Sequence, residues 1–254
     1  MFESARLKIK RADHHISDLE AEFAEFVATK PHRFVVHNDP HTEQIQIRVR
    51  FAKHLPETLS LIIGDAAHNL RSALDHLIWE AVGLDGGTQD KHLKFPSGDN
   101  RVNFESSCKG IVGASDWIKD QFIELEVFSD GKGYMLYFLN ILDNRDKHTT
   151  LNISLRATSH PDFAVFREDG TLLRKMSGNV FITTGKEGVR VGNIPPGCYL
   201  ELDDNAECAP DIFLPYGNRG PFPALKTLKQ VSQMILEIIK TFEAAILARD
   251  NPVG

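Results

Sequence analysis

The sequence lacks the patterns that mark secreted and membrane-spanning proteins. Its three cysteines, Cys108, Cys198 and Cys208, are an odd number without a CxxC pair or metal-ligand spacing, which argues against a disulfide framework and a cysteine metal site. The sequence contains no run of about 18 apolar residues, which a transmembrane helix would require. The N-terminus, "MFESARLKIKRADHHISDLE", has no continuous apolar segment typical of a secretion signal. We therefore expect a cytoplasmic protein that makes no membrane contact.

A surplus of basic residues is also missing. The chain has 29 Lys and Arg against 35 Asp and Glu, a formal net charge of -6. This balance removes the simplest case for nucleic-acid binding and leaves only a local basic patch. The apolar content of 42% and charged content of 25% are ordinary for a globular protein, and 254 residues are enough to bury a substantial core.

Apolar periodicity predicts long helices on both sides of a strand-rich segment. Residues 2–28 and about 56–83 repeat apolar residues at helical spacing, as do "SDWIKDQFIEL", "YMLYFLNILDN" and the final "ALKTLKQVSQMILEIIKTFEAAILA". In contrast, "QIQIRVRF" alternates strictly, "RFVVHNDPHT" offers it a hairpin partner, and short alternating runs separated by "EDG", "GKEG" and "IPPG" follow "LNISLRATS". Residues 85–112 predict a connection with at most short helices.

These elements predict an α+β protein, with an antiparallel β-sheet inserted into a helical bundle before the C-terminal helix. We expect residues 1–254 to form a single domain. Its helical bundle would comprise 1–28, 56–148 and 221–250, and its β elements 33–51 and 149–216.

The stretch "GDAAHNLRSALDHL", residues 64–77, places many polar groups on an otherwise apolar helix. At about 100° per residue, six of them share roughly a third of the helix circumference, and Arg71 flanks them. The pattern predicts a polar patch on a buried or cleft-lining helix, and the mid-helix Gly64 indicates close approach of a neighbouring helix or a ligand. We call the six residues the polar stripe: Asp65, His68, Asn69, Ser72, Asp75 and His76.

A second cluster, "LDNRDKH", ends the predicted helix "YMLYFLNILDN". A charge run of this kind is usually a solvated corner. Its position after a strongly apolar segment nevertheless favours a partly inward orientation of Asp146 or His148, and we expect it to face the polar stripe. Asp146, Lys147 and His148 are therefore candidate supporting or binding residues, together with Asp65, His68, Asn69, Ser72 and Asp75.

Arg71 and His76 fit acid–base chemistry on a phosphodiester. A neutral histidine can accept a proton from a ribose 2′-hydroxyl or give one to the leaving oxygen, and arginine offers permanently charged donors to the phosphorane. Five positions separate the two residues, so they lie on adjacent turns and could converge on one phosphate, particularly if a dimer supplies a second pair. This chemistry needs no metal.

The string "RSALDH", Arg71 to His76, resembles the R-x4-6-H motif of the HEPN superfamily of helical proteins. The resemblance implies a metal-independent endoribonuclease of the toxin or phage-defence type, without a cofactor, in which Arg71 and His76 are catalytic and Ser72 supports them. It also implies RNA as substrate, a composite active site across a homodimer, and a protein partner such as an antitoxin. The longer strings "GDAAHNLRSALDHL" and "LDNRDKH" are similar to a group of uncharacterised bacterial proteins, which implies no activity.

Three alternatives remain open from the residues. The stripe could be a structural network, with an Arg71–Asp75 ion pair, a Ser72–His76 hydrogen bond, and Asp65 and Asn69 anchoring backbone. The chain could be a non-catalytic nucleotide- or protein-binding module. Lastly, Asp65 and His68 have the i,i+3 spacing of helical metal ligands. The other candidate ligands for such a site are "ADHHISD" (Asp13, His14, His15, Asp18) and "DKH". A basic rim around Arg71 would favour RNA cleavage; it would comprise Lys91, Lys94, Arg145 and Lys147.

Overall fold

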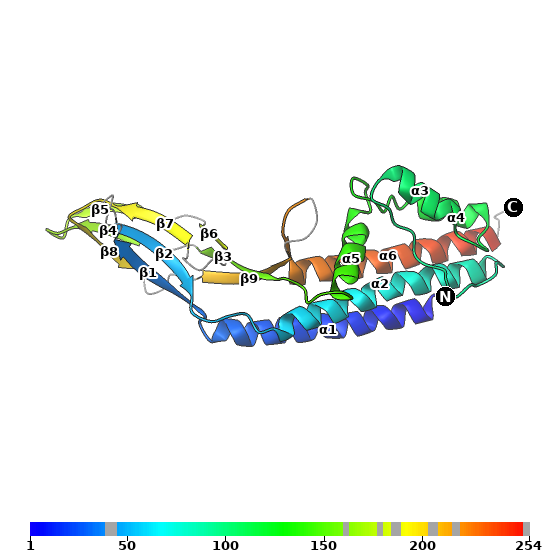
Figure 1. Ribbon diagram of the computed structural model, residues 1–254, viewed down its shortest axis with the longest axis horizontal. Coiled ribbons are helices and arrows are strands. Elements are labelled where there is room, and N and C mark those ends of the chain that lie inside the picture. The colour runs from blue at the N-terminus through cyan, green and yellow to red at the C-terminus, as the bar shows by residue number, and fades with distance from the viewer. Residues whose placement is uncertain are drawn as a thin grey trace. The chain divides into compact units, whose positions relative to one another are not determined.

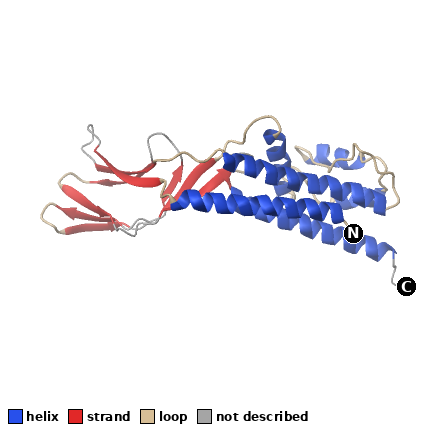
Figure 2. Ribbon diagram, turned by 90° about the horizontal axis from the view of Figure 1, so that it is seen from below, coloured by secondary structure: helices blue, strands red, loops and turns tan. Residues whose placement is uncertain are grey.

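The computed structural model describes residues 1–38, 45–159, 163–176, 180–183, 189–202, 208–214 and 219–250. It confirms the α+β class, because helices precede and follow the strand-rich segment and the last helix comes after the strands (Figures 1 and 2). The strands pair antiparallel, as expected.

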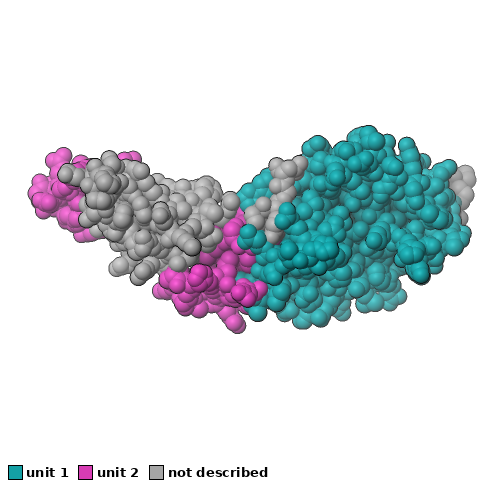
Figure 3. Space-filling model, in the orientation of Figure 1, with its two compact units in different colours: residues 1–20, 58–152, 215–254 teal, residues 21–57, 153–214 magenta. Residues whose placement is uncertain are grey.

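The chain groups into two compact units (Figure 3). The helical unit comprises residues 1–20, 58–152 and 215–254, and the strand unit comprises 21–57 and 153–214. The strand unit exists because strands from its two segments, distant in sequence, pair with one another. Such long-range pairing leaves no mark in the apolar periodicity of either segment.

Six helices are described in the structure, together with a short strand, β10 (Phe222–Pro223). Helix α2 packs against α5 and α6, and Figures 1 and 2 show α1, α2 and α6 lying alongside one another in the helical unit. The helices expected over 2–28 and 56–83 are present within a few residues of their predicted bounds. The six are α1 (Glu3–Ala28), α2 (Thr58–Leu84), α3 (Arg101–Lys109), α4 (Asp116–Ile123), α5 (Tyr134–Asp146) and α6 (Ala224–Asp250).

Helix α2 is the centre of the helical unit. Its apolar residues are buried on more than one face, from Leu59 near its start to Val82 near its end. A helix that is apolar on most of its circumference must be covered by other elements. Consequently, any polar side chain in the middle of α2 either finds a protein partner or opens onto a site.

A cluster of four phenylalanines holds the segment before α3 against the long helices. The rings of Phe122 and Phe242 lie 4.9 Å apart, those of Phe95 and Phe122 lie 5.7 Å apart, and Phe2 contacts Phe242 at 6.4 Å. Burial of one such side chain contributes about 1.5–3 kcal/mol. The cluster therefore fixes the chain around Phe95 close to α2, where it meets the polar groups described below.

The strands of the strand unit lie in three antiparallel arrangements. The first has the order β1-β2-β7, the second includes β9-β3-β6, and the third has the order β5-β4-β8. The "EDG" turn between β4 and β5 is confirmed, with Gly170 at φ 81°. The "GKEG" turn and most of the Asn-Asp-Pro turn lie outside the described residues. The bounds are β1 (His32–Asn38), β2 (Ile45–Phe51), β3 (Ser154–Ser159), β4 (Phe163–Arg167), β5 (Leu172–Met176), β6 (Val180–Thr183), β7 (Val189–Ile194), β8 (Cys198–Leu202) and β9 (Cys208–Leu214).

In the described part of the chain, none of the helices combines the length and the apolar character that crossing a bilayer requires.

Candidate functional site

The residues flanking and forming the polar stripe contact different elements. Arg71 and Asp75 bind the chain at Phe95, His68 contacts α5, and His76 contacts the start of α1. Ser72 is half-buried, and the Asn69 amide donates to the backbone oxygen of Asp65 one turn earlier. The residues of the predicted stripe thus lie in three different environments, which are described in turn below.

Arg71 is the most buried charged residue of the stretch, at 8% exposed. Its Nη1 donates to Asp75 Oδ1 at 2.5 Å, its Nε to Asn140 Oδ1 at 3.0 Å, and its Nη2 to the Phe95 carbonyl at 3.3 Å. The Phe95 N–H donates to the same Asp75 oxygen at 2.7 Å. The Arg71–Asp75 ion pair of the structural-network alternative is present. Each nitrogen of the guanidinium donates to a protein group, and these bonds join α2, α5 and the chain at Phe95.

His76 belongs to a separate cluster at the start of α1. Its Nδ1 lies 2.8 Å from Ser4 Oγ. The Glu80 carboxylate accepts from the Ser4 N–H at 3.1 Å, from the Ala5 N–H at 3.4 Å, and from the Ser4 hydroxyl. A carboxylate at this position satisfies free N–H groups and complements the positive end of the helix dipole. The partners of His76 therefore come from α1, whereas those of Arg71 come from α5 and Phe95. Their catalytic pairing stays a prediction.

His68 and the end of α5 form the exposed part of the site. His68 Nδ1 lies 2.9 Å from Asp143 Oδ1, and Lys147 Nζ lies 2.5 Å from Asp143 Oδ2. Asp143 is only 1% exposed, whereas the His68 side chain is 52% exposed. A buried carboxylate needs such partners to compensate for its loss of water. Because a carboxylate only accepts hydrogen bonds, a neutral His68 carries its proton on Nδ1 and leaves the Nε2 lone pair free.

Asp146 lies beside this pair and packs against the α2 backbone. A methyl group added to Gly64 would lie 2.5 Å from Asp146 Cγ, so the glycine leaves room for this carboxyl group. Burial raises the pKa of Asp146 above its usual value, and the nearby charges of Asp65 and Asp143 raise it further, while His68 lowers it. The expected inward orientation of the "LDNRDKH" cluster is confirmed for Asp146, whereas His148 is exposed.

Two important members of the site were missed as candidates. Asp143 and Asn140 follow the buried Leu139 and Leu136 at helical spacing on α5. Residues at i, i+3, i+4 and i+7 share one helix face, so Asp143 lies on the covered side together with Leu136 and Leu139. That spacing could have identified Asp143 as a buried carboxylate in need of a partner.

The alternative of a metal site at Asp65 and His68 requires further ligands close to them. Within the described residues, three or more His, Cys, Asp or Glu side chains nowhere converge in a way that could hold a metal ion. His14 Nε2 instead lies 3.7 Å from Asp18 Oδ2 on the exposed face of α1.

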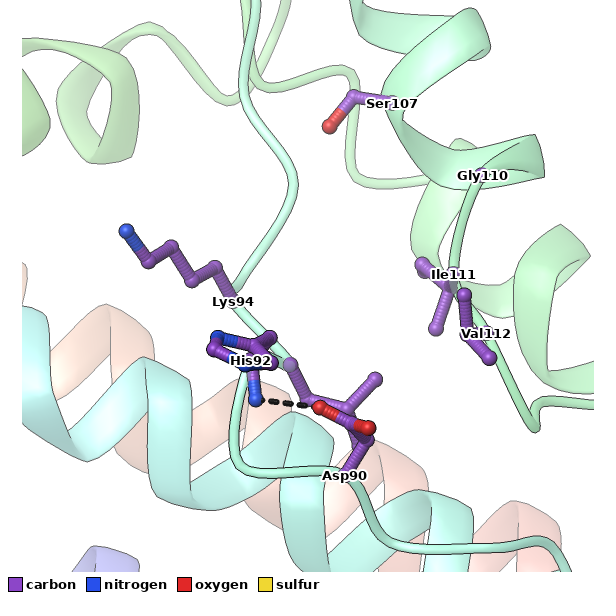
Figure 4. Close-up of a pocket in the computed structure, with 8 residues that line it drawn as sticks. Asp90, His92, Lys94, Ser107, Gly110, Ile111 and Val112 are labelled. Carbon is purple, nitrogen blue, oxygen red and sulfur yellow. Dashed lines mark hydrogen bonds between the residues drawn. The ribbon is translucent and has the colours of Figure 1, made fainter.

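A separate cavity of about 360 Å³ is lined in part by residues that come just before Phe95 in the sequence (Figure 4). His92 and Lys94 line one wall, and Ile111 and Val112 line the wall opposite. The His92 N–H donates to Asp90 Oδ1 at 2.6 Å and so closes a turn in the first wall. Since Phe95 is bound by Arg71 and Asp75, these two residues anchor the segment that forms this wall.

Comparison with protein-family models, with curated proteins and with solved structures found no match.

Proposed function

We propose that this protein is a metal-independent RNA-cleaving enzyme whose acid–base pair is His68 and Asp146. The observation that carries the proposal is the half-exposed His68 imidazole, held by the buried Asp143, next to a carboxyl group with a raised pKa. Two neighbouring titratable groups whose environments favour opposite roles are typical of acid–base catalysis. RNA as the substrate comes from the resemblance of "RSALDH" to the HEPN motif.

Each group has a defined role in this chemistry. His68 Nε2 accepts the proton of a ribose 2′-hydroxyl, and the 2′-oxygen attacks the adjacent phosphorus. Protonated Asp146 gives its proton to the leaving 5′-oxygen, so the products are a 2′,3′-cyclic phosphate and a free 5′-hydroxyl. Asp143 fixes the orientation and tautomer of His68. The Lys147 ammonium, bound to Asp143 and 48% exposed, supplies positive charge for the developing phosphorane.

The geometry supports this assignment better than catalysis by Arg71 and His76 within one chain. The Arg71 guanidinium donates to Asp75, Asn140 and Phe95, so it would have to break buried hydrogen bonds to reach a phosphate. Breaking such a network costs several kcal/mol. In this proposal Arg71 is a positioning residue that holds α5 and the Phe95 segment on α2.

A second candidate function is a non-catalytic nucleotide-binding module. It is favoured by the cavity beside the segment that precedes Phe95, whose lining includes Lys94 and the apolar Ile111 and Val112. Its volume lies within the range of ordinary small-molecule sites. In this case the stripe would serve to hold the cavity wall.

Cleavage of a labelled RNA of mixed sequence in EDTA tests the proposal. We expect wild-type protein to cut it and leave a 2′,3′-cyclic phosphate, detected by mass spectrometry. The matched control is the same sequence made of DNA, which lacks the attacking 2′-hydroxyl and should remain intact. An RNA that remains uncut would contradict the enzyme proposal, and binding of a mononucleotide without cleavage would favour the second candidate.

A further inference from the structure

The strands β1, β2 and β7 form a sheet with two chemically different faces. Side chains alternate between the faces of a strand, and residues directly opposite in neighbouring strands share a face. Ile45, Ile47 and Val49 therefore share one face, which also contains Ile194, the partner of Ile45. Ile194, at a register position of this face, is 1% exposed.

The opposite face contains four arginine positions from three separate segments. Arg33 is paired with Arg50, and Arg48 is paired with Arg190. The register shift between Ile47 and Arg48 matters here, because an unshifted register would place Val191 opposite Arg48. The shift brings Arg190 into the row. We call these positions the arginine face: Arg33, Arg48, Arg50 and Arg190.

The other register positions on this face carry no acidic residue. They are Val35, His37, Gln46 and Asn193, and the described residues of the three strands contain no Asp or Glu. Four positive positions thus gather in a chain whose formal net charge is -6.

Like charges at directly opposite positions destabilise a sheet. The register places arginine opposite arginine at two positions, Arg33–Arg50 and Arg48–Arg190, where a polyanionic ligand would offset the positive charge. Arginine binds phosphate with a planar, bidentate group, whereas amide side chains such as Gln46 and Asn193 donate to sugar and phosphate oxygens. Along β2, Arg48 and Arg50 stand about 7 Å apart, and neighbouring strands lie about 4.8 Å apart.

We propose that the arginine face binds the phosphate backbone of single-stranded RNA. This inference rests on the proposed function, from which it takes RNA as the ligand. Single-stranded nucleic acids are held by positively charged surfaces that follow the backbone, and the binding weakens with salt.

Binding of a fluorescein-labelled 2′-O-methyl oligouridylate 12-mer, measured by anisotropy, tests the inference. This oligonucleotide has no free 2′-hydroxyl, so binding is measured separately from cleavage. The variant Arg48→Gln/Arg190→Gln should bind at least tenfold more weakly. Each lost phosphate contact lowers the slope of log affinity against log salt by about 0.7, so the double variant should lose about 1.4.

The matched control is Arg167→Gln/Arg174→Gln, which removes the same charge from the exposed positions of β4 and β5. We expect its affinity to stay within twofold of wild type. Equal loss in both variants, no change in the first, or no binding by wild type would overturn the inference. Displacement of the oligonucleotide by polyglutamate at the same charge concentration would also overturn it, in favour of an acidic protein partner.

Two further readouts keep the outcomes separate. Because the Arg48→Gln/Arg190→Gln change removes a like-charge pair, its melting temperature should not fall, so weak binding cannot be attributed to unfolding. Wild-type protein that binds the oligonucleotide but cuts no RNA would overturn the proposed function and support this inference. If wild-type protein cleaves RNA and the double variant binds the oligonucleotide as tightly as wild type, the proposed function is supported and this inference is overturned.

Discussion

His68 on α2 and Asp143 on α5 are 75 positions apart in the sequence and lie 2.9 Å apart, from Nδ1 to Oδ1. The carboxylate is buried and also bound by Lys147, whereas half of the imidazole is exposed. This relationship joins the two polar strings of the sequence into one site. It also fixes which ring nitrogen is free to react, because the other is bound to a group that only accepts hydrogen bonds.

Replacement of Asp143 tests this orientation. In Asp143→Asn the amide can donate to Nδ1, which favours the tautomer whose Nε2 carries the proton and cannot act as a base. We expect the single-turnover RNA cleavage rate to fall by about 10²-fold or more, within the range of a general base. A rate within threefold of wild type, in a variant with an unchanged circular dichroism spectrum, would contradict the role of Asp143.

The raised pKa of Asp146 has a defined effect on stability. Between the usual value of 3.8 and the raised pKa, the folded state binds more protons than the unfolded state. The free energy of unfolding contributed by Asp146 therefore falls as the pH rises through this window and stays lower above it. Asp146→Asn removes the charge and should become more stable relative to wild type as the pH rises. Urea unfolding at pH 3.5 and pH 7 measures the difference; a trend of the opposite sign would contradict the burial of this carboxyl group.

The same group should control the upper pH limit of cleavage. A general acid must be protonated, so the wild-type rate should fall as the pH rises through the raised pKa of Asp146. In Asp146→Asn this limb of the pH–rate profile should disappear and the maximal rate should drop. A profile that keeps its high-pH limb in the variant would assign the acid to another residue.

Gly64→Ala separates the site from the fold. Alanine is favoured over glycine in a helix by about 1 kcal/mol, but the added methyl group overlaps the carboxyl group of Asp146. We expect the variant to remain folded, with its melting temperature close to that of wild type, and to lose cleavage to a similar extent as Asp146→Asn. Gly110→Ala, a change at a helix end where the nearest atom lies at 3.3 Å, is the control and should cleave normally.

Arg71→Ala should affect stability more than any exposed ion pair does. The change leaves Asp75, whose side chain is 36% exposed, without Arg71 and frees the Asn140 and Phe95 oxygens, which should cost about 2–3 kcal/mol in total. Chemical denaturation measures the effect, and Arg101→Ala, which removes an exposed pair with Glu126, should cost far less. Equal losses in the two variants would show that Arg71 does not act as a structural anchor.

The sequence predicted the class and most helices because apolar periodicity is a local signal. Helix α2 begins and ends within two residues of the expected 56–83, and the strict alternation of "QIQIRVRF" correctly predicted β2. The inward orientation of Asp146 followed from its position after an apolar helix. Local patterns carry this information because each helix or strand face is defined by its own residues.

The remaining features depend on contacts between distant segments. The residues of the stripe contact Phe95, α5 and α1, and this cannot be predicted from the sequence of α2 alone. The angular position of a residue on a helix gives the direction of its side chain but not the segment that it contacts. The contact of His76 with Ser4 joins two residues that are 72 positions apart in the sequence. Likewise, the arginine face depends on the pairing of β2 with β7 and on one register shift.

Comparison of His68→Ala with His76→Ala in the EDTA cleavage assay tests the central claim most directly. Both changes remove one half-buried or exposed imidazole from the same helix, so they are closely matched. The account predicts that His68→Ala abolishes cleavage of RNA and that His76→Ala cleaves close to the wild-type rate, with both variants folded. Loss of cleavage in folded His76→Ala while His68→Ala stays active would contradict it and place the catalytic base at the other end of the stripe.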